Sequence, residues 1–199
     1  LVPLARERGY RVEVTQMDTC PQLELPPTWE EYLSRLSARH RHEVRRKLRR
    51  LDQGGPALYY AVDGQGGLRQ DMDDFIRLFK ISRSDKEEFM APEMVGFFQT
   101  MAHSMAEGGY LKLFFLEMEG VRVATALCFD YGDARYLYNS GFDPQYAFFS
   151  VGLLLKVLCL KEGIEGKKKR FDFLRGAEAY KYDLGGQDVP IYRCLIQRP

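Results

Sequence analysis

The sequence predicts an α+β protein whose mixed, mostly antiparallel sheet carries helices on both faces. Three strand-like runs follow one another across tight turns between residues 111 and 142, and turns this short make neighbouring strands antiparallel. Helix-like segments with one apolar face precede these runs, and a segment that is apolar nearly all round follows them. A helix of that composition must be buried on most sides, so it is expected to pack on the sheet.

The N-terminal segment is predicted to stand apart from the rest. Residues 10–14 alternate like a strand, and Pro21, Pro26 and Pro27 are expected to interrupt regular structure after them. We therefore interpret residues 1–27 as the remnant of a preceding segment or half-domain, and residues 28–199 as one domain, a size that suits a single core. The first residue is Leu1 rather than Met, which favours a fragment or a processed chain.

A long helix is predicted from Thr28, which forms a capping box with Glu31, to the glycines at 54 and 55. One face is apolar, and the other is basic and opposed only by Glu43. The basic residues are Arg35, Arg39, Arg41, Arg45, Arg46, Lys47, Arg49 and Arg50. Two interpretations stay open: a surface for an anionic ligand or nucleic acid, or a solvated helix face balanced by acids elsewhere.

The other elements follow from periodicity and from the turn residues between them. The first are a strand over 58–62, a helix from about Asp71, a polar break over 82–88, and a helix with Pro92 in its first turn and Gly108-Gly109 at its end. Strands over 111–117, 121–131 and 135–142 follow, and a loop at 143–145 leads to the buried helix over 150–162, with Gly163 as its stop. The last are a strand over 171–174, a short helix or loop over 177–184, and a strand over 190–197.

Composition excludes several classes of protein. The net charge of +1 argues against a polycation that holds nucleic acid by bulk charge. No apolar run is long enough for a membrane span, since Lys156 breaks the best candidate. No two of the four cysteines have metal-ligand spacing, so no zinc site is expected. Buried thiols in a reducing cytoplasm are the expected state, and the oligomeric state is not predictable.

The start of the buried helix is the segment best suited to chemistry. Helix N-termini leave backbone N–H groups unpaired and carry partial positive charge, so they bind anions, phosphates especially. The first turn here offers Ser150, Val151, Gly152 and Leu153. Gly152 would let a ligand approach the backbone, and Ser150 would cap the helix or touch the ligand. Alternatively, Ser150 is only an N-cap and Gly152 only allows tight packing of helix on sheet.

Several motifs occur in an order that is similar to the GNAT acyltransferase fold. They are the Arg-rich helix at 45–51, the strand at 120–127, Tyr138-Asn139-Ser140-Gly141-Phe142-Asp143-Pro144, the helix start at 150–155, Phe171-Asp172-Phe173-Leu174-Arg175-Gly176, and Glu178-Ala179-Tyr180-Lys181. With these motifs the sequence resembles the GNAT-like acetyltransferases of cellulose-biosynthesis type, which are relatives of the Fem peptidyltransferases.

The resemblance implies acyl-coenzyme A, acetyl-CoA in the first place, as the donor. It implies that the strand residues Tyr138, Asn139, Ser140 and Gly141 pair with the pantetheine arm, and that the first turn of the buried helix, residues 150–153, takes the pyrophosphate. The usual loop motif Arg/Gln-x-x-Gly-x-Gly/Ala is reduced here to its last glycine, and Ser150 replaces the first.

Acyl transfer to an amine or a hydroxyl needs a base, an oxyanion donor and an acid for the leaving group. The resemblance places Tyr180 where such folds often have the acid, and a Tyr half-buried at the sheet edge is the alternative. Asp172, Glu178 and Asp143 are the candidate bases, although Asp172 would equally pair with Arg175 or Lys181. Arg175 and Lys181 would hold phosphates or serve as ordinary ion-pair partners.

These observations lead to one main functional hypothesis and two alternatives. The main hypothesis is an acyltransferase that moves an acyl group from acyl-coenzyme A to an amine or hydroxyl of a small molecule, or of a polysaccharide or peptide precursor. The alternatives are a Fem-like transferase that uses aminoacyl-tRNA, and a degenerate fold kept as a binding module. The main hypothesis requires the strands at 135–142 and 171–174 to separate beside Ser150.

Overall fold

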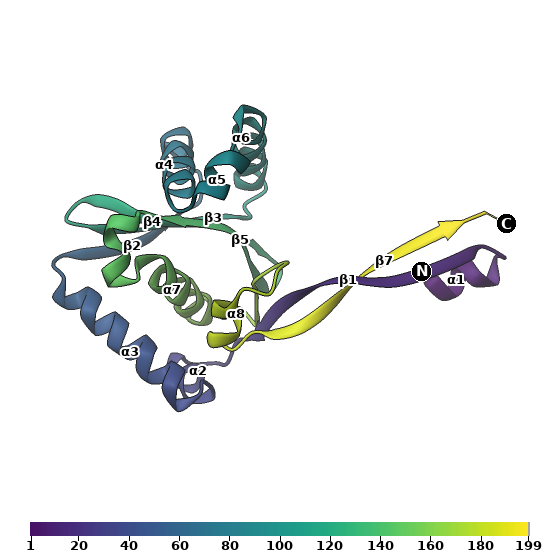
Figure 1. Cartoon of the computed structure of the whole chain (residues 1–199), viewed down its shortest axis with the longest axis horizontal. Helices are drawn as coiled ribbons and strands as arrows, with labels where there is room; N and C mark the ends of the chain where they lie inside the picture. Colours follow the sequence, from purple (N-terminus) through teal and green to yellow (C-terminus); the bar gives the residue numbers. More distant parts are fainter. Residues whose placement is uncertain (199) are drawn as a thin grey trace.

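One seven-stranded sheet, in the order β2-β3-β4-β5-β6-β1-β7, forms the centre of the computed structural model, which describes residues 1–198 (Figure 1). The strands are β1 (Arg11–Glu24), β2 (Ala57–Val62), β3 (Leu111–Met118), β4 (Val121–Tyr131), β5 (Ala134–Phe142), β6 (Arg170–Asp172) and β7 (Gln187–Gln197). Neighbouring strands are antiparallel except β5 and β6, which are parallel. The predicted α+β class with a mostly antiparallel sheet is confirmed.

Helices cover both faces of this sheet (Figure 1). They are α1 (Val2–Glu7), α2 (Trp29–Arg35), α3 (Ala38–Gln53), α4 (Leu68–Ile81), α5 (Ser84–Phe89), α6 (Pro92–Glu107), the 3-10 helix η1 (Pro144–Phe149), α7 (Val151–Glu165) and α8 (Ala179–Asp183). Helices α4, α5 and α6 lie on one face, and α7 lies on the other with α2, α3 and α8 outside it. Each face therefore has its own apolar core.

Helix α7 is the buried helix that the sequence predicts. Leu154, Val157 and Leu160 along it are fully buried, because sheet and outer helices enclose it. Its predicted stop at Gly163 is wrong, since the helix continues to Glu165 and ends at Gly166, whose amide donates to Glu162 O at 2.8 Å. Gly163 instead lies inside the helix, where it is buried against its neighbours.

The single long helix predicted from Thr28 is also wrong, because the chain forms two helices there. Thr28 does cap α2, with its hydroxyl accepting from the Glu31 amide at 3.2 Å. Leu36 then adopts extended backbone, and Ser37 caps α3 by accepting from the His40 amide at 3.2 Å. A serine hydroxyl that takes a backbone donor favours a new helix start over a continuous helix.

Strand β1 extends through Pro21, so the expectation that this proline interrupts regular structure is wrong. Pro21 lies opposite Asp188 of β7, and its carbonyl accepts from Phe173 N at 3.0 Å. Strand β1 pairs with both β6 and β7, so hydrogen bonds join the N-terminal segment to the sheet. Its interpretation as the remnant of a preceding half-domain, with a boundary at 27, stays a prediction.

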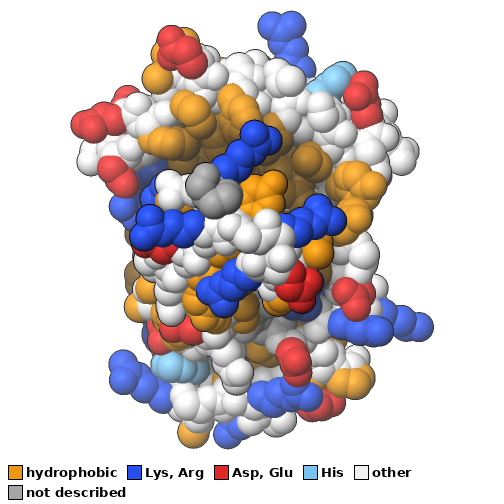
Figure 2. Space-filling view, turned by 90° about the vertical axis from the view of Figure 1, so that its right-hand side faces the viewer, with side chains coloured by type: hydrophobic (Ala, Val, Ile, Leu, Met, Phe, Trp, Pro, Cys, Tyr) orange, Lys and Arg blue, Asp and Glu red, His pale blue; other side chains and the backbone are white. Residues whose placement is uncertain are grey.

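Beyond β6, strands β1 and β7 project as a two-stranded arm that carries α1 and both chain ends at its tip (Figure 1). Viewed from the side of the arm, hydrophobic side chains gather around its base (Figure 2). The side chains of the arm are themselves largely exposed, among them Met17, Tyr192 and Ile196.

Strands β5 and β6 separate after a short parallel pairing. Only Ala134–Tyr136 of β5 pair with β6, while β5 continues to Phe142. The chain after β6 turns toward β1 instead, where Gly176 N donates to Thr19 O at 3.2 Å. We use the term strand gap for the region between residues 138–142 of β5 and residues 173–176. The separation that the main hypothesis requires is thus present, and side chains from α5, α7 and α8 lie around it.

Candidate active site at the strand gap

Backbone groups of β5 point into the strand gap. Asp143 N donates to Val123 O of β4 at 2.8 Å, and in an antiparallel pair the residues that bond across alternate with residues that point away. The N–H and C=O groups of Phe142 and Ser140 therefore face away from β4. The register also skips Tyr138, because Leu127 pairs with Asn139 and the next β4 residue pairs with Leu137; such bulges are frequent beside active sites.

The other predicted residues of β5 serve packing. The ring of Tyr138 lies against Phe98 and Phe129, in the core under α4 and α6. Gly141 lies directly beneath α4, where a Cβ would be only 2.5 Å from backbone atoms of Phe79. Pairing of Tyr138, Asn139, Ser140 and Gly141 with a pantetheine arm remains a prediction, which the backbone edge at Ser140 suits best, since it has no partner strand there.

Lys86 of α5 reaches the strand gap, and sequence reasoning missed it. Its Nζ donates to the Ser140 carbonyl at 2.6 Å and lies 4.6 Å from the centre of the Phe79 ring. Burial lowers the pKa of Lys86 to about 8, and the charge of Arg83 adds to that effect. In the sequence Lys86 belongs to a polar run between two helices, so only the folded arrangement distinguishes it from a surface lysine.

Lys156 and Tyr180 meet on the other side of the strand gap. Lys156 Nζ donates to Gly152 O at 3.0 Å and lies 4.8 Å from the centre of the Tyr180 ring. Burial lowers the pKa of Lys156 to about 8, and repulsion from Lys86 adds to this. Burial raises the pKa of Tyr180 well above its ordinary value, and the charge of Glu178 raises it further. Tyr180 is therefore protonated at neutral pH.

Lys181 and Glu178 hold the loop after β6. Lys181 is 2% exposed, and its Nζ donates to the carbonyls of Leu174, Arg175 and Gly176, each at 3.0 Å. It also pairs with the Glu178 carboxylate at 2.9 Å. Burial alone would raise the pKa of Glu178, but the bond from Lys181 outweighs it and the pKa is lowered. The Glu178 side chain is 55% exposed, so this carboxylate is ionised and accessible.

Asp172 and Arg175 both point toward β1 and do not pair with each other. The Asp172 carboxylate accepts from Gln22 Nε2 and from the Leu174 amide, both at 2.8 Å, and burial raises its pKa. The Arg175 guanidinium pairs with the Asp18 carboxylate. Of the three predicted catalytic residues, the fold thus brings Glu178 and Tyr180 to the strand gap and turns Asp172 away; a catalytic role for any of them stays a prediction.

The start of α7 has two free amides and a cation beside it. Ser150 has a φ of +56°, and its hydroxyl caps no amide but accepts from Lys47 Nζ at 2.8 Å. Its carbonyl takes the amides of Leu153 and Leu154, whereas those of Val151 and Gly152 donate to no acceptor within residues 1–198. Lys47 also pairs with the Glu43 carboxylate at 3.3 Å, so this ammonium already has a counter-ion. The two free amides at the positive end of the helix are the part of the arrangement that suits a bound anion.

Gly152 also fulfils the packing role considered for it. A Cβ at this position would lie 2.7 Å from the Phe142 ring, a distance that real side chains do not tolerate. The glycine therefore lets the first turn of α7 pack closely against the end of β5, which brings the two free amides next to the strand gap.

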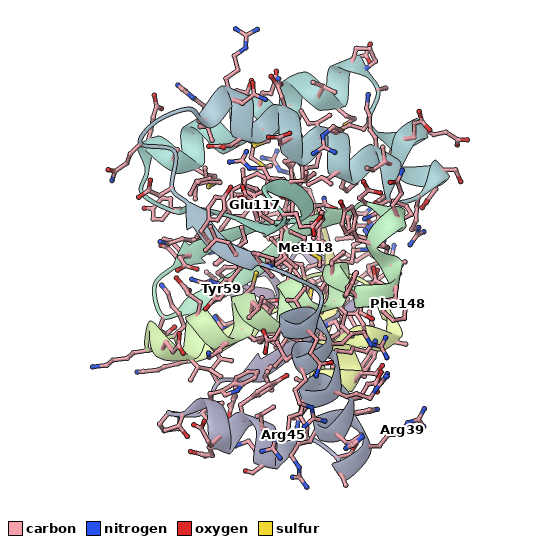
Figure 3. The ribbon with its side chains drawn as sticks, turned by 90° about the vertical axis from the view of Figure 1, so that its left-hand side faces the viewer. Arg39, Arg45, Tyr59, Glu117, Met118 and Phe148 are labelled. Carbon is pink, nitrogen blue, oxygen red and sulfur yellow. The ribbon has the colours of Figure 1, made fainter. Side chains whose placement is uncertain are left out.

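Helix α3 gives the neighbourhood of this turn a strongly basic character. It carries seven Arg or Lys residues against two acids. Arg46, Arg49 and Arg50 line a cavity of about 480 Å³ together with η1. Arg50 donates to the Phe148 carbonyl at 3.0 Å and stacks on its ring. Figure 3 shows Phe148 together with Arg39 and Arg45, which project from α3. The basic face is thus partly a cavity wall and partly solvated surface.

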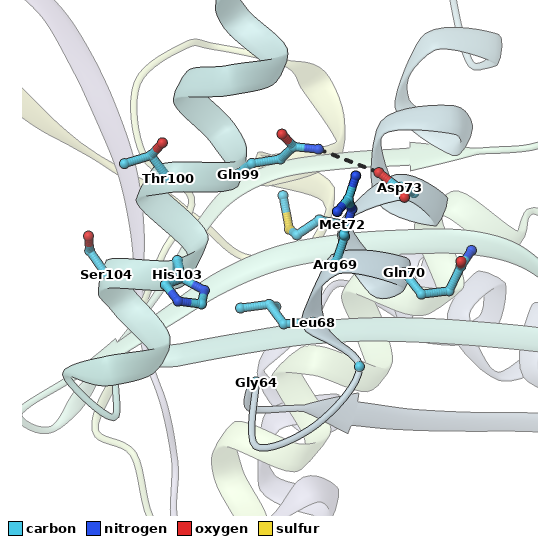
Figure 4. A pocket seen from close by; sticks show the side chains of 11 residues that line it. Gly64, Leu68, Arg69, Gln70, Met72, Asp73, Gln99, Thr100, His103 and Ser104 are labelled. Carbon is cyan, nitrogen blue, oxygen red and sulfur yellow. Dashed lines mark hydrogen bonds between the residues drawn. The ribbon is translucent and has the colours of Figure 1, made fainter.

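The largest cavity described, about 950 Å³, lies elsewhere. It is formed between α4 and α6, where Gln99 donates to Asp73 at 3.4 Å (Figure 4). Its wall includes Arg69 and His103 but none of the predicted site residues. It borders the start of α4, whereas the strand gap borders the end of that helix at Phe79.

The family of the chain follows from a comparison with protein-family models. Residues 38–182 match the model described as "Acetyltransferase (GNAT) domain". The chain therefore belongs to the GNAT acetyltransferase domain family, and the predicted resemblance is confirmed. Family and fold identify an acyltransferase domain, but they do not distinguish an acyl-coenzyme A donor from an aminoacyl-tRNA donor. Within residues 1–198, no helix has the length and apolar character needed to cross a membrane.

Solved structures share this fold at low sequence identity. FemX superimposes with a TM-score of 0.72 at 13% identity, over 94% of this chain and 65% of FemX. L-PGS from Bacillus licheniformis gives 0.62 at 10% identity, over 100% of this chain and 65% of L-PGS. A conserved protein of unknown function from Bacteroides thetaiotaomicron gives 0.67 at 12% identity, over 99% and 66%. The chain thus spans about two thirds of each. No curated protein matches the sequence significantly.

Proposed function

We propose that this chain transfers an acyl group from acyl-coenzyme A, with acetyl-CoA as the simplest donor, to an amine or hydroxyl acceptor. The observation that carries the proposal is the separation of β5 from β6 next to the start of α7. The separation leaves a strand edge without a partner strand at Ser140 and Phe142, and free amides at Val151 and Gly152. An extended, amide-containing arm that ends in a diphosphate matches both features.

The residues present suit each part of such a donor. The pantetheine amides would bond to the backbone of Ser140 and Phe142 as an added strand does. The diphosphate would take the free amides of α7 and the ammonium of Lys47. The guanidinium groups that line the cavity at α3 would bind the remaining phosphate of the nucleotide.

The chemistry follows from the two side chains at the strand gap. The ionised carboxylate of Glu178 would accept a proton from the acceptor amine, whose nitrogen then attacks the acyl carbonyl. Tyr180, which stays protonated, would donate a hydrogen bond to the leaving atom. The accessibility of Glu178 is compatible with a bulky acceptor, so a polysaccharide or peptide precursor is proposed beside a small molecule.

Binding of acetyl-CoA tests the donor directly. A ligand that binds only the folded chain must raise the midpoint of thermal unfolding. We expect such a rise, and Lys47→Met should weaken binding roughly tenfold by removing a charge from the diphosphate site. Arg45→Met is the matched control, since it removes a charge from the exposed side of α3. Absence of stabilisation at millimolar acetyl-CoA, or equal loss in both variants, would argue against the proposal.

A Fem-like transferase that uses aminoacyl-tRNA is the second candidate, favoured by the basic face of α3 and the cavity at Arg46, Arg49 and Arg50. Its test is tRNA binding as a function of salt. Replacing these three arginines by Gln should reduce the salt slope by about two to three if they contact phosphates. The same change at Arg6, Arg8 and Arg11 in the arm is the control. A chain that binds neither donor would be a degenerate module.

A further inference from the structure

We propose that Lys86, rather than Tyr180, supplies the proton that the leaving group takes up in the acyl transfer. This inference rests on the proposed function, and it assigns a further catalytic residue within the same strand gap. In the transfer the nitrogen of the acceptor bonds to the acyl carbon and the carbon–sulfur bond breaks. The electron pair of that bond stays on sulfur, and an N–H proton of Lys86 moves to it. The acceptor nitrogen loses its proton to Glu178 or water, so the products are an amide and a neutral thiol.

The position of Lys86 is the first argument. Its Nζ donates to the Ser140 carbonyl, one of the backbone groups of β5 that face the strand gap. A donor arm that adds to this edge would pass that carbonyl, and its reacting bond would lie within reach of the ammonium. The ammonium also lies over the Phe79 ring, in a cation–π contact. Within residues 1–198 the ammonium has this one hydrogen-bond acceptor, which leaves N–H groups available.

The pKa values of the two candidate acids, Lys86 and Tyr180, are the second argument. An ordinary thiol has a pKa of about 8.5, so an acid with a pKa near 8 transfers its proton with little change in free energy. Burial lowers the pKa of Lys86 to about 8. An ordinary tyrosine, with a pKa of about 10, is already roughly thirtyfold less favourable. Burial raises the pKa of Tyr180 further, so Tyr180 is suited to donate a hydrogen bond but not a proton.

The charges around Lys86 support a protonated but labile ammonium. Arg83 on the same helix repels it and Asp85 attracts it, while Glu178 attracts it from the segment that precedes α8. The charge of Lys86 in turn lowers the pKa of Lys156 on α7. Lys156 itself is buried and bonded within its own helix, so it is the less accessible of the two lysines.

Leaving-group dependence provides the decisive experiment. Lys86→Met should fold, since the side chain keeps its length and apolar stem, and thermal unfolding checks this. With acetyl-CoA we expect the kcat of Lys86→Met to be lower than that of the unmodified chain by about 100-fold or more. With S-phenyl thioacetate, whose aryl thiolate leaves without a proton, the variant and the unmodified chain should react at rates within about threefold of each other. Lys161→Met, at a partly exposed position of α7, is the control and should change neither rate.

The pH profile separates a proton donor from a mere positive charge. The unmodified chain should lose activity above about pH 8, as Lys86 loses its proton. Lys86→Arg keeps the charge, but its guanidinium holds its proton too tightly. We expect this variant to stay slow with acetyl-CoA and to show no decline with pH near 8.

The outcomes distinguish this inference from the function on which it rests. If the unmodified chain transfers no acyl group from acetyl-CoA, the proposed function fails and the assignment of Lys86 fails with it. If the unmodified chain is active and Lys86→Met is as fast as the unmodified chain with both acetyl-CoA and S-phenyl thioacetate, only the assignment of Lys86 is overturned. Selective rescue by the aryl thioester in Tyr180→Phe or Lys156→Met, with none in Lys86→Met, would assign the proton to that residue instead.

Discussion

The two edges of the strand gap hold their lysines in different ways. On the side of β6, Lys181 donates to three carbonyls of the loop and pairs with a carboxylate. On the side of β5, Lys86 donates to one carbonyl and otherwise lies against an aromatic ring. A lysine whose N–H groups are all bonded fixes the shape of the loop. A lysine that keeps N–H groups free retains the capacity to act on a substrate.

The largest expected effect tests the structural side of this contrast. Lys181→Met would leave three inward-facing carbonyls without their donor, and each lost partner costs about 1 kcal/mol or more. We expect the free energy of unfolding to fall by about 3 kcal/mol or more, measured by urea denaturation. Lys161→Met serves as the control and should change little. A loss below about 1 kcal/mol would show that the loop does not depend on this lysine.

Replacing Lys156 should change the free energy of unfolding in the opposite direction, toward greater stability. The pKa of Lys156 is lowered to about 8 from 10.5. Below pH 8 the folded state therefore contains a buried ammonium, which lowers its stability. Stability of the unmodified chain should therefore rise as the pH increases from about 8 to 10.5. Lys156→Met removes the buried charge, and we expect it to be more stable at pH 7 by about 2 kcal/mol, with no such rise. Urea denaturation at pH 7 and pH 10 decides this, and a less stable variant would contradict it.

The exposed helix α3 should give the smallest effect. The bond from Arg46 lowers the pKa of Glu43 to about 2, from an ordinary 4.5. The carboxylate therefore contributes stability above pH 4.5, and this contribution is lost as the pH falls toward 2. Because the side chain is 39% exposed, Glu43→Gln should cost only a few tenths of a kcal/mol at pH 7 and nothing at pH 2. Thermal unfolding at both pH values measures the difference.

The sequence predicts well those features that local pattern determines. Alternation and short turns determine β3, β4 and β5, and uniform hydrophobicity identifies α7 as the buried helix. Whether a proline interrupts a strand depends on which edge of the strand lacks the N–H. At Pro21 this depends on pairing with β7, which is distant in sequence, so the local sequence misleads. Helix α2 ends at Leu36 and Ser37 starts α3 within a continuous apolar pattern, so periodicity alone does not reveal the break.

The candidate site is predictable only in part, for a related reason. Tyr180 and Glu178 stand out because a motif surrounds them, and the fold does bring them to the strand gap. Asp172 stands in the same motif, but pairing of β6 with β1 turns it toward Gln22. Lys86 has no local signal at all, since its burial comes from α4 and from the end of β5. Such residues become visible only when segments far apart in sequence are placed together.

The unpaired edge of β5 also has a consequence for amide hydrogen–deuterium exchange. The amides of Ser140 and Phe142 belong to a long strand, yet they point away from β4 into the strand gap. They should take up deuterium from solvent far faster than the amides of Asn139 and Gly141, which bond across to β4. A donor that adds to this edge would slow exchange at those two amides, which gives a residue-by-residue record of where it lies.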